Sequence, residues 1–94
     1  MIKLNTSQIK DYLKTLNSPW VLMNNSLHRA FIFKDFEAAF SFITHVAAIA
    51  EELNHHPRWE NEYNKVDIAL YTHDADGITE KDFILAQKID QIVI

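Results

Sequence analysis

The chain lacks cysteine and has little glycine or proline, and each shortage excludes a class of protein. With no cysteine in 94 residues, it cannot form a disulfide framework, an iron–sulfur cluster or a thiolate zinc site. One glycine and two prolines leave no Gly- or Pro-rich linker that would separate two domains. We therefore expect a single domain over residues 1–94, because two smaller cores would each bury too little apolar surface.

Basic residues and long apolar runs are also scarce. Lys and Arg number 9 against 13 Asp and Glu, and the formal net charge is −4. Nucleic-acid binding usually needs a clustered basic excess, so we expect no direct binding to nucleic acid. Residues 1–6 do not resemble a signal peptide, and no apolar run reaches membrane-spanning length. We expect a cytoplasmic, soluble protein with no membrane partner.

Apolar spacing and turn residues divide the chain into seven elements. Helix caps, the turn residues Asn24-Asn25-Ser26 and the helix-stopping Pro57 mark the boundaries. The expected elements are a helix from Thr6 or Ser7 to about Leu16, ending before Asn17-Ser18-Pro19; strands at 20–23 and 27–33; a helix at 36–53; strands at 59–63 and 65–72; and a helix from Thr79 to about Ile92. This order predicts an α+β fold, a two-layer α-β-β-α-β-β-α sandwich whose four-stranded antiparallel sheet carries three helices on one face.

The central helix has more apolar residues than one face needs. The main stripe, predicted to pack on the sheet, contains Phe36, Ala39, Phe40, Ile43, Val46, Ala47, Ala50 and Leu53. Phe42 and Ile49 lie off this stripe and predict a second patch that one subunit would leave in water. Two interpretations stay open: a contact in a homodimer or homotetramer, or two scattered exposed side chains.

Three of the five histidines lie at the ends of predicted elements. His55 and His56 close the central helix, and His73 follows the last strand. Imidazole both gives and takes protons near neutral pH, and sites are often built at element ends. The positions predict acid–base chemistry, with capping of helix-end carbonyls as the open alternative. His28 and His45 are expected to have no functional role.

Two glutamates precede the histidine pair at helical spacing. Glu51 comes four residues before His55, and Glu52 comes four before His56. A carboxylate on one ring nitrogen fixes the tautomer and raises the basicity of the other nitrogen. Glu51 is a candidate for orienting His55, with an ordinary surface pair as the alternative, and for Glu52 the surface pair is favoured.

A zinc site competes with this interpretation, because three histidines and an open water position form a known catalytic arrangement. Neighbouring helix residues, however, point about 100° apart. Helical zinc ligands usually stand at i and i+4, as in H-E-x-x-H, which the sequence lacks. Two adjacent rings suit an extended flat ligand better than one ion, so we expect no metal.

One ordered set of residues resembles the signature of the pterin-4a-carbinolamine dehydratase family. It consists of Glu51, His55-His56-Pro57, Tyr63, His73 and Asp82 at their spacings here, and Trp20, Phe33-Lys34-Asp35-Phe36, Trp59, Tyr63-Asn64-Lys65-Val66, Thr72-His73, Gly77 and Leu85-Ala86 also read as in that family. The resemblance spans nearly the whole chain. It implies the fold derived above and dehydration of a 4a-hydroxytetrahydropterin to the quinonoid dihydropterin and water, without metal or organic cofactor. It also implies a pterin substrate and assembly as dimers or tetramers.

The resemblance further implies roles for individual residues. His55, His56 and His73 would be the catalytic residues, supplying one acid and one base. Glu51 would orient a ring, and Asn54 stands where some members carry Asp, so it offers an amide without charge. The other expected pterin contacts are Thr72, Asp74, Trp20 and Trp59, with core packing as the alternative for the two tryptophans.

Two expectations remain to be set against the structure. Asp82 is expected to act only as a helix-opening residue. The alternative to an enzyme is a non-catalytic pterin-binding, assembly or regulatory scaffold that keeps the same fold. Three imidazoles facing one cleft would favour catalysis, and a pocket filled by side chains would favour the scaffold.

Overall fold

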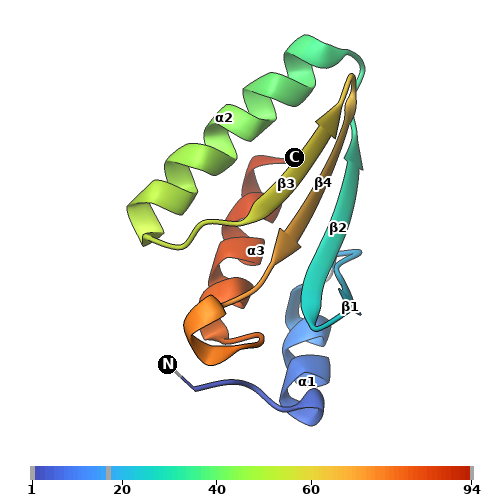
Figure 1. Cartoon of the computed structure of the whole chain (residues 1–94). Helices are drawn as coiled ribbons and strands as arrows, with labels where there is room; N and C mark the ends of the chain where they lie inside the picture. Colours follow the sequence, from blue (N-terminus) through green and yellow to red (C-terminus); the bar gives the residue numbers. More distant parts are fainter. Residues whose placement is uncertain (1, 17, 94) are drawn as a thin grey trace.

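The computed structural model describes residues 2–16 and 18–93, and these residues form three α-helices, four strands and a one-turn 3₁₀ helix (Figure 1). The elements are α1 (Thr6–Leu16), β1 (Val21–Met23), β2 (Ser26–Ile32), α2 (Phe36–Leu53), β3 (Arg58–Glu62), β4 (Lys65–Leu70), the 3₁₀ helix η1 (His73–Ala75) and α3 (Glu80–Ile92). The predicted α+β class and the α-β-β-α-β-β-α order are confirmed.

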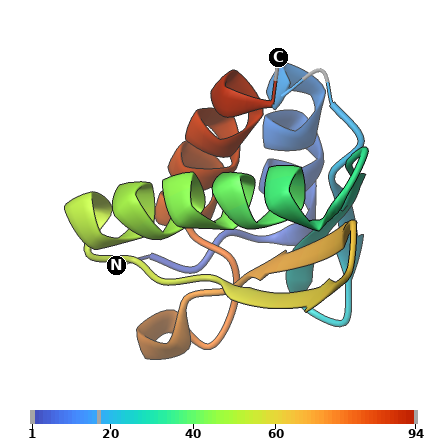
Figure 2. The ribbon, with the colours of Figure 1, turned by 90° about the horizontal axis from the view of Figure 1, so that it is seen from above.

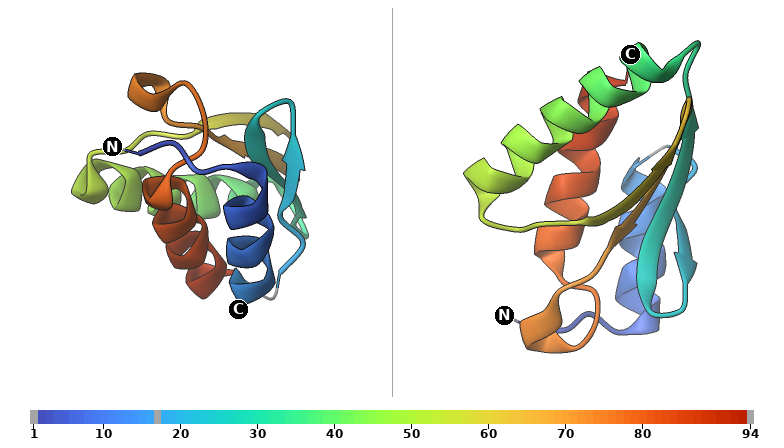
Figure 3. Two further views of the ribbon diagram at one scale, coloured as in Figure 1. Left: turned by 90° about the horizontal axis from the view of Figure 1, so that it is seen from below. Right: turned by 45° about the horizontal axis from the view of Figure 1, so that its top comes forward.

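The four strands form one antiparallel sheet in the order β1-β2-β4-β3. The central pair is β2 and β4, in which Leu27 stands opposite Leu70 and Phe31 stands opposite Val66. All four of these side chains are buried, since they point toward the helices. Figures 2 and 3 show the helices gathered on one face of the curved sheet. Among the described residues, no α-helix covers the other face (Figures 2 and 3).

Local sequence signals place the first hairpin turn and the starts of α2 and α3 where they were expected. Asn24 and Asn25 take left-handed backbone conformations with φ of 50° and 64°, which asparagine tolerates, and they close the β1–β2 hairpin. Asp35 caps α2 by accepting a hydrogen bond from the Ala38 amide at 2.9 Å. Thr79 and Asp82 form a reciprocal capping box that opens α3, as the sequence predicted.

Strand boundaries differ from prediction by one or two residues. Strand β3 begins one residue early and ends before Tyr63, which takes φ of 50° in the turn to β4. Strand β4 ends at Leu70, and Thr72 instead forms an isolated bridge with Gly77. Asn17, the first residue of the break predicted after α1, lies outside the described residues.

The prediction of an outward patch at Phe42 and Ile49 is wrong. Phe42 is only 5% exposed, and its ring lies 4.7 Å from that of Phe31, while Ile49 packs against the core. Phe36 and Phe40, assigned to the buried stripe, are instead 46% and 54% exposed. Both faces of α2 carry apolar residues at helical spacing, so the rotation of the helix depends on where the sheet lies. Association of subunits stays a prediction, with its candidate contact moved to Phe36 and Phe40.

A polar cluster joins β2 and the segment before β1 to α3. Asp90 accepts hydrogen bonds from the Trp20 Nε1 at 2.8 Å and from the Ser18 hydroxyl at 2.5 Å, and it pairs with Arg29 at 2.5 Å. Trp20 is 4% exposed and meets Phe31 edge to face. Trp20 is therefore a core residue whose indole N–H is satisfied by α3.

Within residues 2–16 and 18–93, no helix combines the length and apolar character required to cross a membrane.

Candidate functional site

A cleft of about 400 Å³ lies on the open sheet face, at the end where β2 begins and β4 ends. Its lining residues, which we call the histidine cleft, are Asn24, Asn25, Ser26, His28, His56, Arg58, Ala69, Tyr71 and His73. This volume falls in the range of about 300 to 1,000 Å³ that is usual for small-molecule sites. Three imidazoles reach it, from β2, from the α2–β3 connection and from η1, and two of them, His56 and His73, are predicted catalytic residues. The third, His28, was expected to have no role.

His73 owes its place to the short loop that follows β4. The isolated bridge between Thr72 and Gly77 closes this loop, and the Asp76 amide donates to the His73 carbonyl at 3.1 Å. The Tyr71 hydroxyl donates to the Asp76 carboxylate within the same loop. The Asn25 side-chain amide donates to the Asp76 carbonyl at 3.3 Å. Because Asn25 belongs to the β1–β2 turn, this last bond ties two walls of the cleft together.

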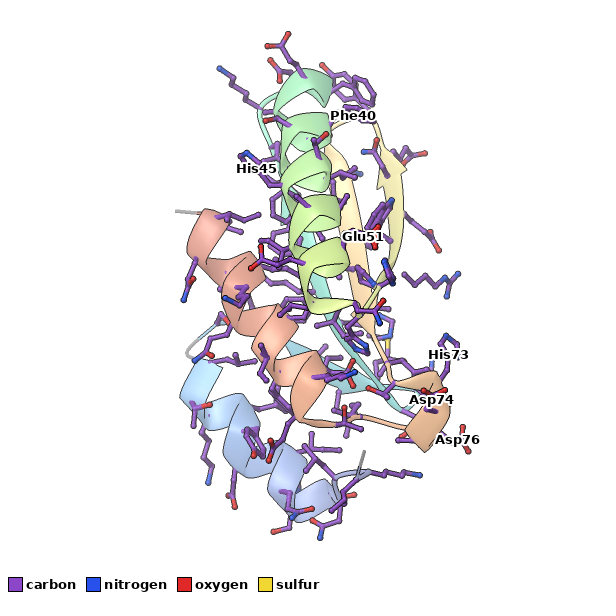
Figure 4. The ribbon with its side chains drawn as sticks, turned by 90° about the vertical axis from the view of Figure 1, so that its left-hand side faces the viewer. Phe40, His45, Glu51, His73, Asp74 and Asp76 are labelled. Carbon is purple, nitrogen blue, oxygen red and sulfur yellow. The ribbon has the colours of Figure 1, made fainter. Side chains whose placement is uncertain are left out.

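His56 projects from the connection between α2 and β3. Its Nε2 lies 3.3 Å from Glu51 Oε1, and the two side chains are 58% and 78% exposed. The Glu51 carboxylate therefore contacts His56, which corrects the prediction that it orients His55. Figure 4 shows Glu51 near the C-terminal end of α2 and His73 on the one-turn helix. A pair this exposed contributes at most about 1 kcal/mol to stability.

The end of α2 explains why the four-residue spacing of Glu51 and His55 does not bring the two side chains together. The helix stops at Leu53, and Asn54 adopts a left-handed conformation with φ of 52°. The amides of Asn54 and His55 both donate to the Ala50 carbonyl, so the chain turns away from the helix axis. His55 consequently no longer stands above Glu51. Asn54 has a structural role as the left-handed cap, and its predicted contact with the pterin stays a prediction.

His55 turns inward to a buried carboxylate instead. Its Nε2 lies 2.6 Å from Oδ1 of Asp82, and the two side chains are 11% and 0% exposed. His55 is not among the residues that line the histidine cleft. Two of the three predicted catalytic imidazoles thus share the cleft surface, while the third lies behind it next to His56 in the chain.

Thr72 belongs to the same buried group rather than to the cleft surface. Its hydroxyl donates to Asp82 Oδ2 at 2.8 Å and lies 2.9 Å from the Thr79 hydroxyl, with all three residues buried. Direct contact between Thr72 and a pterin stays a prediction. Thr72 lies one layer deeper, where it supports the carboxylate that meets His55.

The remaining predicted contacts are not among the residues that line the histidine cleft. Trp20 is in the core, and Asp74 is an exposed residue of η1 beside His73 (Figure 4). Trp59 stands opposite Ile68, whose side chain is buried, so the indole points toward the face covered by helices and is 37% exposed. Trp59 also borders a second, adjoining hollow of about 490 Å³ on the sheet, which shares His28, Arg58 and Ala69 with the cleft.

Among the described residues, no group of three or more His, Cys, Asp or Glu side chains is arranged to hold a metal ion. The expectation of a reaction without metal or organic cofactor stays a prediction.

Comparison with known proteins identifies the family. The family model described as pterin 4 alpha carbinolamine dehydratase matches residues 2–92. The chain belongs to this family. A provisionally named pterin-4-alpha-carbinolamine dehydratase of Rhizobium meliloti (strain 1021) is 52% identical over 91 residues, covering 95% of this chain and 86% of the relative. One of Christiangramia forsetii is 46% identical over 93 residues, covering 99% and 95%.

A solved structure confirms the fold of the family. The crystal structure of a transcriptional coactivator/pterin dehydratase from Brucella melitensis matches this chain with a TM-score of 0.91 and 40% sequence identity. The match covers 96% of this chain and 97% of that one. The shared fold therefore extends over nearly the full length of both chains.

Sequence reasoning gave no site role to three residues of this candidate site. His28 follows a turn and alternates outward from the buried Leu27, which was a readable signal that it faces the open sheet surface. Tyr71 likewise alternates with Leu70 and Thr72. Asp82 stood in the family signature but was assigned only to the start of a helix, because its contact with His55 joins residues 27 positions apart.

Proposed function

We propose that this protein dehydrates a 4a-hydroxytetrahydropterin to the quinonoid dihydropterin and water, and so supports the recycling of tetrahydrobiopterin. Membership of the pterin 4 alpha carbinolamine dehydratase family supports the reaction class. The observation that carries the proposal is the histidine cleft, in which His56 and His73 from different elements line one cavity of about 400 Å³.

The reaction needs two proton transfers. The C4a hydroxyl leaves as water after it receives a proton, while the proton on N5 passes to a base as the C4a–N5 double bond forms. Imidazole serves either purpose near neutral pH, so two imidazoles on one cleft match one acid and one base. We assign these transfers to the group formed by His55, His56 and His73. His56 and His73 lie at the cleft surface, and His55 lies behind them on Asp82.

The lining also suits a flat, polar ring system. Asn24, Asn25 and Ser26 place amide and hydroxyl groups at one wall, where the donor and acceptor edge of a pterin would bind. Ala69 forms part of the floor, and its small side chain leaves the sheet surface free for a ring to lie against. Polar groups of this kind orient a ligand, while apolar area contributes most of the affinity.

The test is stopped-flow absorbance of freshly generated 4a-hydroxytetrahydropterin mixed with the pure protein. We expect the wild type to accelerate loss of the carbinolamine, with a rate that survives treatment with a chelator. His73→Ala and His56→Ala should each lower kcat by about a hundredfold. His45→Ala is the matched control, because His45 is exposed on α2 outside the cleft lining.

Two results would count against the proposal. If folded wild-type protein gave no acceleration, the non-catalytic pterin-binding or assembly scaffold would take first place. If chelation abolished the rate, the histidine mechanism would need a metal and would be wrong as stated.

A further inference from the structure

Asp82 has a buried carboxyl group that the proposed proton transfers do not use. Its side chain is 0% exposed, and an ionised carboxylate in such a place is costly unless hydrogen bonds and an opposite charge satisfy it. Both oxygens are engaged: Oδ1 meets His55 Nε2 at 2.6 Å, and Oδ2 accepts from the Thr79 amide at 2.9 Å. Oδ2 also accepts from the Thr72 hydroxyl at 2.8 Å. Opening a helix requires only the bond to Thr79.

The directions of these hydrogen bonds can be worked out. The Thr72 hydroxyl has one proton and donates it to Asp82 Oδ2, so in its contact with Thr79 it must accept. Thr79 therefore donates to Thr72, and Thr72 donates to Asp82. Both groups that contact Oδ2, the Thr72 hydroxyl and the Thr79 amide, donate a proton to it. An ionised carboxylate can only accept, so the ring nitrogen of His55 that faces it must be the protonated one.

From this geometry we infer that Asp82, held by Thr72 and Thr79, is the positioning residue of His55. It keeps the proton of the neutral ring on Nε2 and leaves Nδ1 as the free acceptor. This inference rests on the proposed function, because it concerns one member of the proposed histidine group. It also assigns to Asp82 the orienting role that the sequence indicated for Glu51, which instead contacts the exposed His56.

The arrangement has the parts of a rigid support. The carboxylate lies on the first turn of α3, Thr79 caps that helix, and Thr72 follows β4 directly before His73. The same buried group thus connects the loop that carries His73 with the α2–β3 connection that carries His55 and His56. Such a support fixes ring orientation by packing and hydrogen bonds rather than by flexible surface contacts.

Asp82→Asn is the sharpest test, because the two side chains have nearly the same shape. The amide oxygen can still accept from Thr79 and Thr72, which turns the NH₂ group toward His55 and requires Nε2 to accept. We expect the neutral His55 ring to carry its proton on Nδ1 in this variant. Ring ¹⁵N chemical shifts in histidine-labelled protein at alkaline pH report the two nitrogens separately. With the carbinolamine substrate, kcat should fall by about a hundredfold while KM changes by less than about threefold.

Glu51→Gln is the matched control, since it removes the carboxylate that contacts His56 without touching the buried group. It should leave the His55 ring shifts unchanged. Asp82→Asn protein that is folded by circular dichroism, with Nε2 still protonated and wild-type kcat, would overturn the inference.

A second variant covers the case in which Asp82→Asn does not fold. Thr72→Val removes one donor to Oδ2 and keeps both the carboxylate and the capping box. It should shift the His55 Nε2–H resonance and lower kcat by about three- to tenfold, and Thr72→Ser should restore both. If Thr72→Val left the resonance and kcat unchanged, the positioning role would be wrong.

Failure of the proposed function gives a different result. Wild-type protein without dehydratase activity would remove the catalytic meaning of His55, yet the ring nitrogen shifts would still reverse in Asp82→Asn. Normal activity together with unchanged shifts would remove the positioning role alone.

Discussion

The ring of Tyr71 meets the ring of His73 edge to face, with centroids 5.0 Å apart and planes at 84°. The same tyrosine donates its hydroxyl to Asp76 in the loop that follows His73. One side chain therefore both packs against the imidazole and holds the loop that presents it. The histidine cleft is built by such local contacts on the β4 side and by the buried Asp82 group on the α3 side.

The hydrogen bond of Tyr71 predicts a change of stability with pH. Donation to Asp76 raises the pKa of Tyr71 above its ordinary value of 10.0, because ionisation removes the shared proton and places two negative charges together. A raised pKa means that the folded state favours the protonated form of Tyr71. The stability contributed by the Tyr71–Asp76 hydrogen bond is therefore fully present below about pH 10 and is lost as pH rises through the folded-state pKa. The difference in unfolding free energy between wild type and Tyr71→Phe should shrink as pH rises above this range.

Urea unfolding at a series of alkaline pH values measures this difference. Tyr63→Phe is the control, because Tyr63 is 63% exposed in the β3–β4 turn. A difference between wild type and Tyr71→Phe that stays constant with pH would show that the bond to Asp76 does not contribute in solution.

His28 should affect binding more than chemistry. It lines the cleft from β2, where it pairs with Ala69 and Val21 across the sheet. We expect His28→Ala to raise KM by about three- to tenfold with kcat within about twofold, because it removes a wall contact made equally in ground and transition states. Steady-state kinetics with the carbinolamine substrate measure both constants, beside His45→Ala. A large loss of kcat with unchanged KM would instead place His28 in the proton transfers.

Phe42 and Phe40 form a matched pair for testing the rotation of α2. Phe42 is 5% exposed and contacts Phe31 and Phe33, whereas Phe40 is 54% exposed. Phe42→Ala should lower the free energy of unfolding by about 3 to 5 kcal/mol. At protein concentrations low enough to separate the subunits, Phe40→Ala should change it by less than about 0.5 kcal/mol. Urea denaturation of both variants checks this, and equal losses would mean that the helix face is assigned wrongly.

The exposed phenylalanines of α2 should matter for association. Phe36 and Phe40 lie one turn apart with ring centroids separated by 5.7 Å, forming an apolar patch that a second subunit would cover. We expect light scattering coupled to gel filtration to show wild-type dimers or tetramers and a smaller species for Phe36→Ser/Phe40→Ser. Circular dichroism of the double variant should match that of the wild type. Unchanged mass in a folded double variant would exclude this patch as the subunit contact.

Most of the fold could be predicted from the sequence because its signals are local. Asp35 and Thr79 indicate helix starts because their side chains cap the first turn. Asn24-Asn25 indicates a tight hairpin because both residues tolerate the left-handed conformation. Alternation along β2 and β4 separates buried from open faces with a period of two residues. These signals depend on neighbours within a few positions, so they can be interpreted without knowing how the rest of the chain folds.

The rotation of α2 about its own axis could not be predicted in this way. Its apolar residues allow two rotations, and only contact with β2 selects the one that buries Phe42 and exposes Phe40. The burial of Trp20 and its hydrogen bond to Asp90 could not be predicted either, because the two residues are 70 positions apart in the sequence. Periodicity reports that a helix has an apolar side, but the sheet decides which side is used.

In the candidate site, too, local features could be predicted from the sequence and long-range contacts could not. By itself the sequence determined the histidines, the hairpins and helix ends that carry them, and the family resemblance that pointed to a pterin. Only the tertiary structure decided that His28 joins His56 and His73 at one cleft and that His55 meets Asp82 rather than Glu51. The physical reason is the left-handed residue Asn54, which ends α2 one residue before the histidine pair and cancels the helical spacing. Once the helix ends, partners are chosen by the packing of α3 and β4 against the connection, and that packing involves residues distant in sequence.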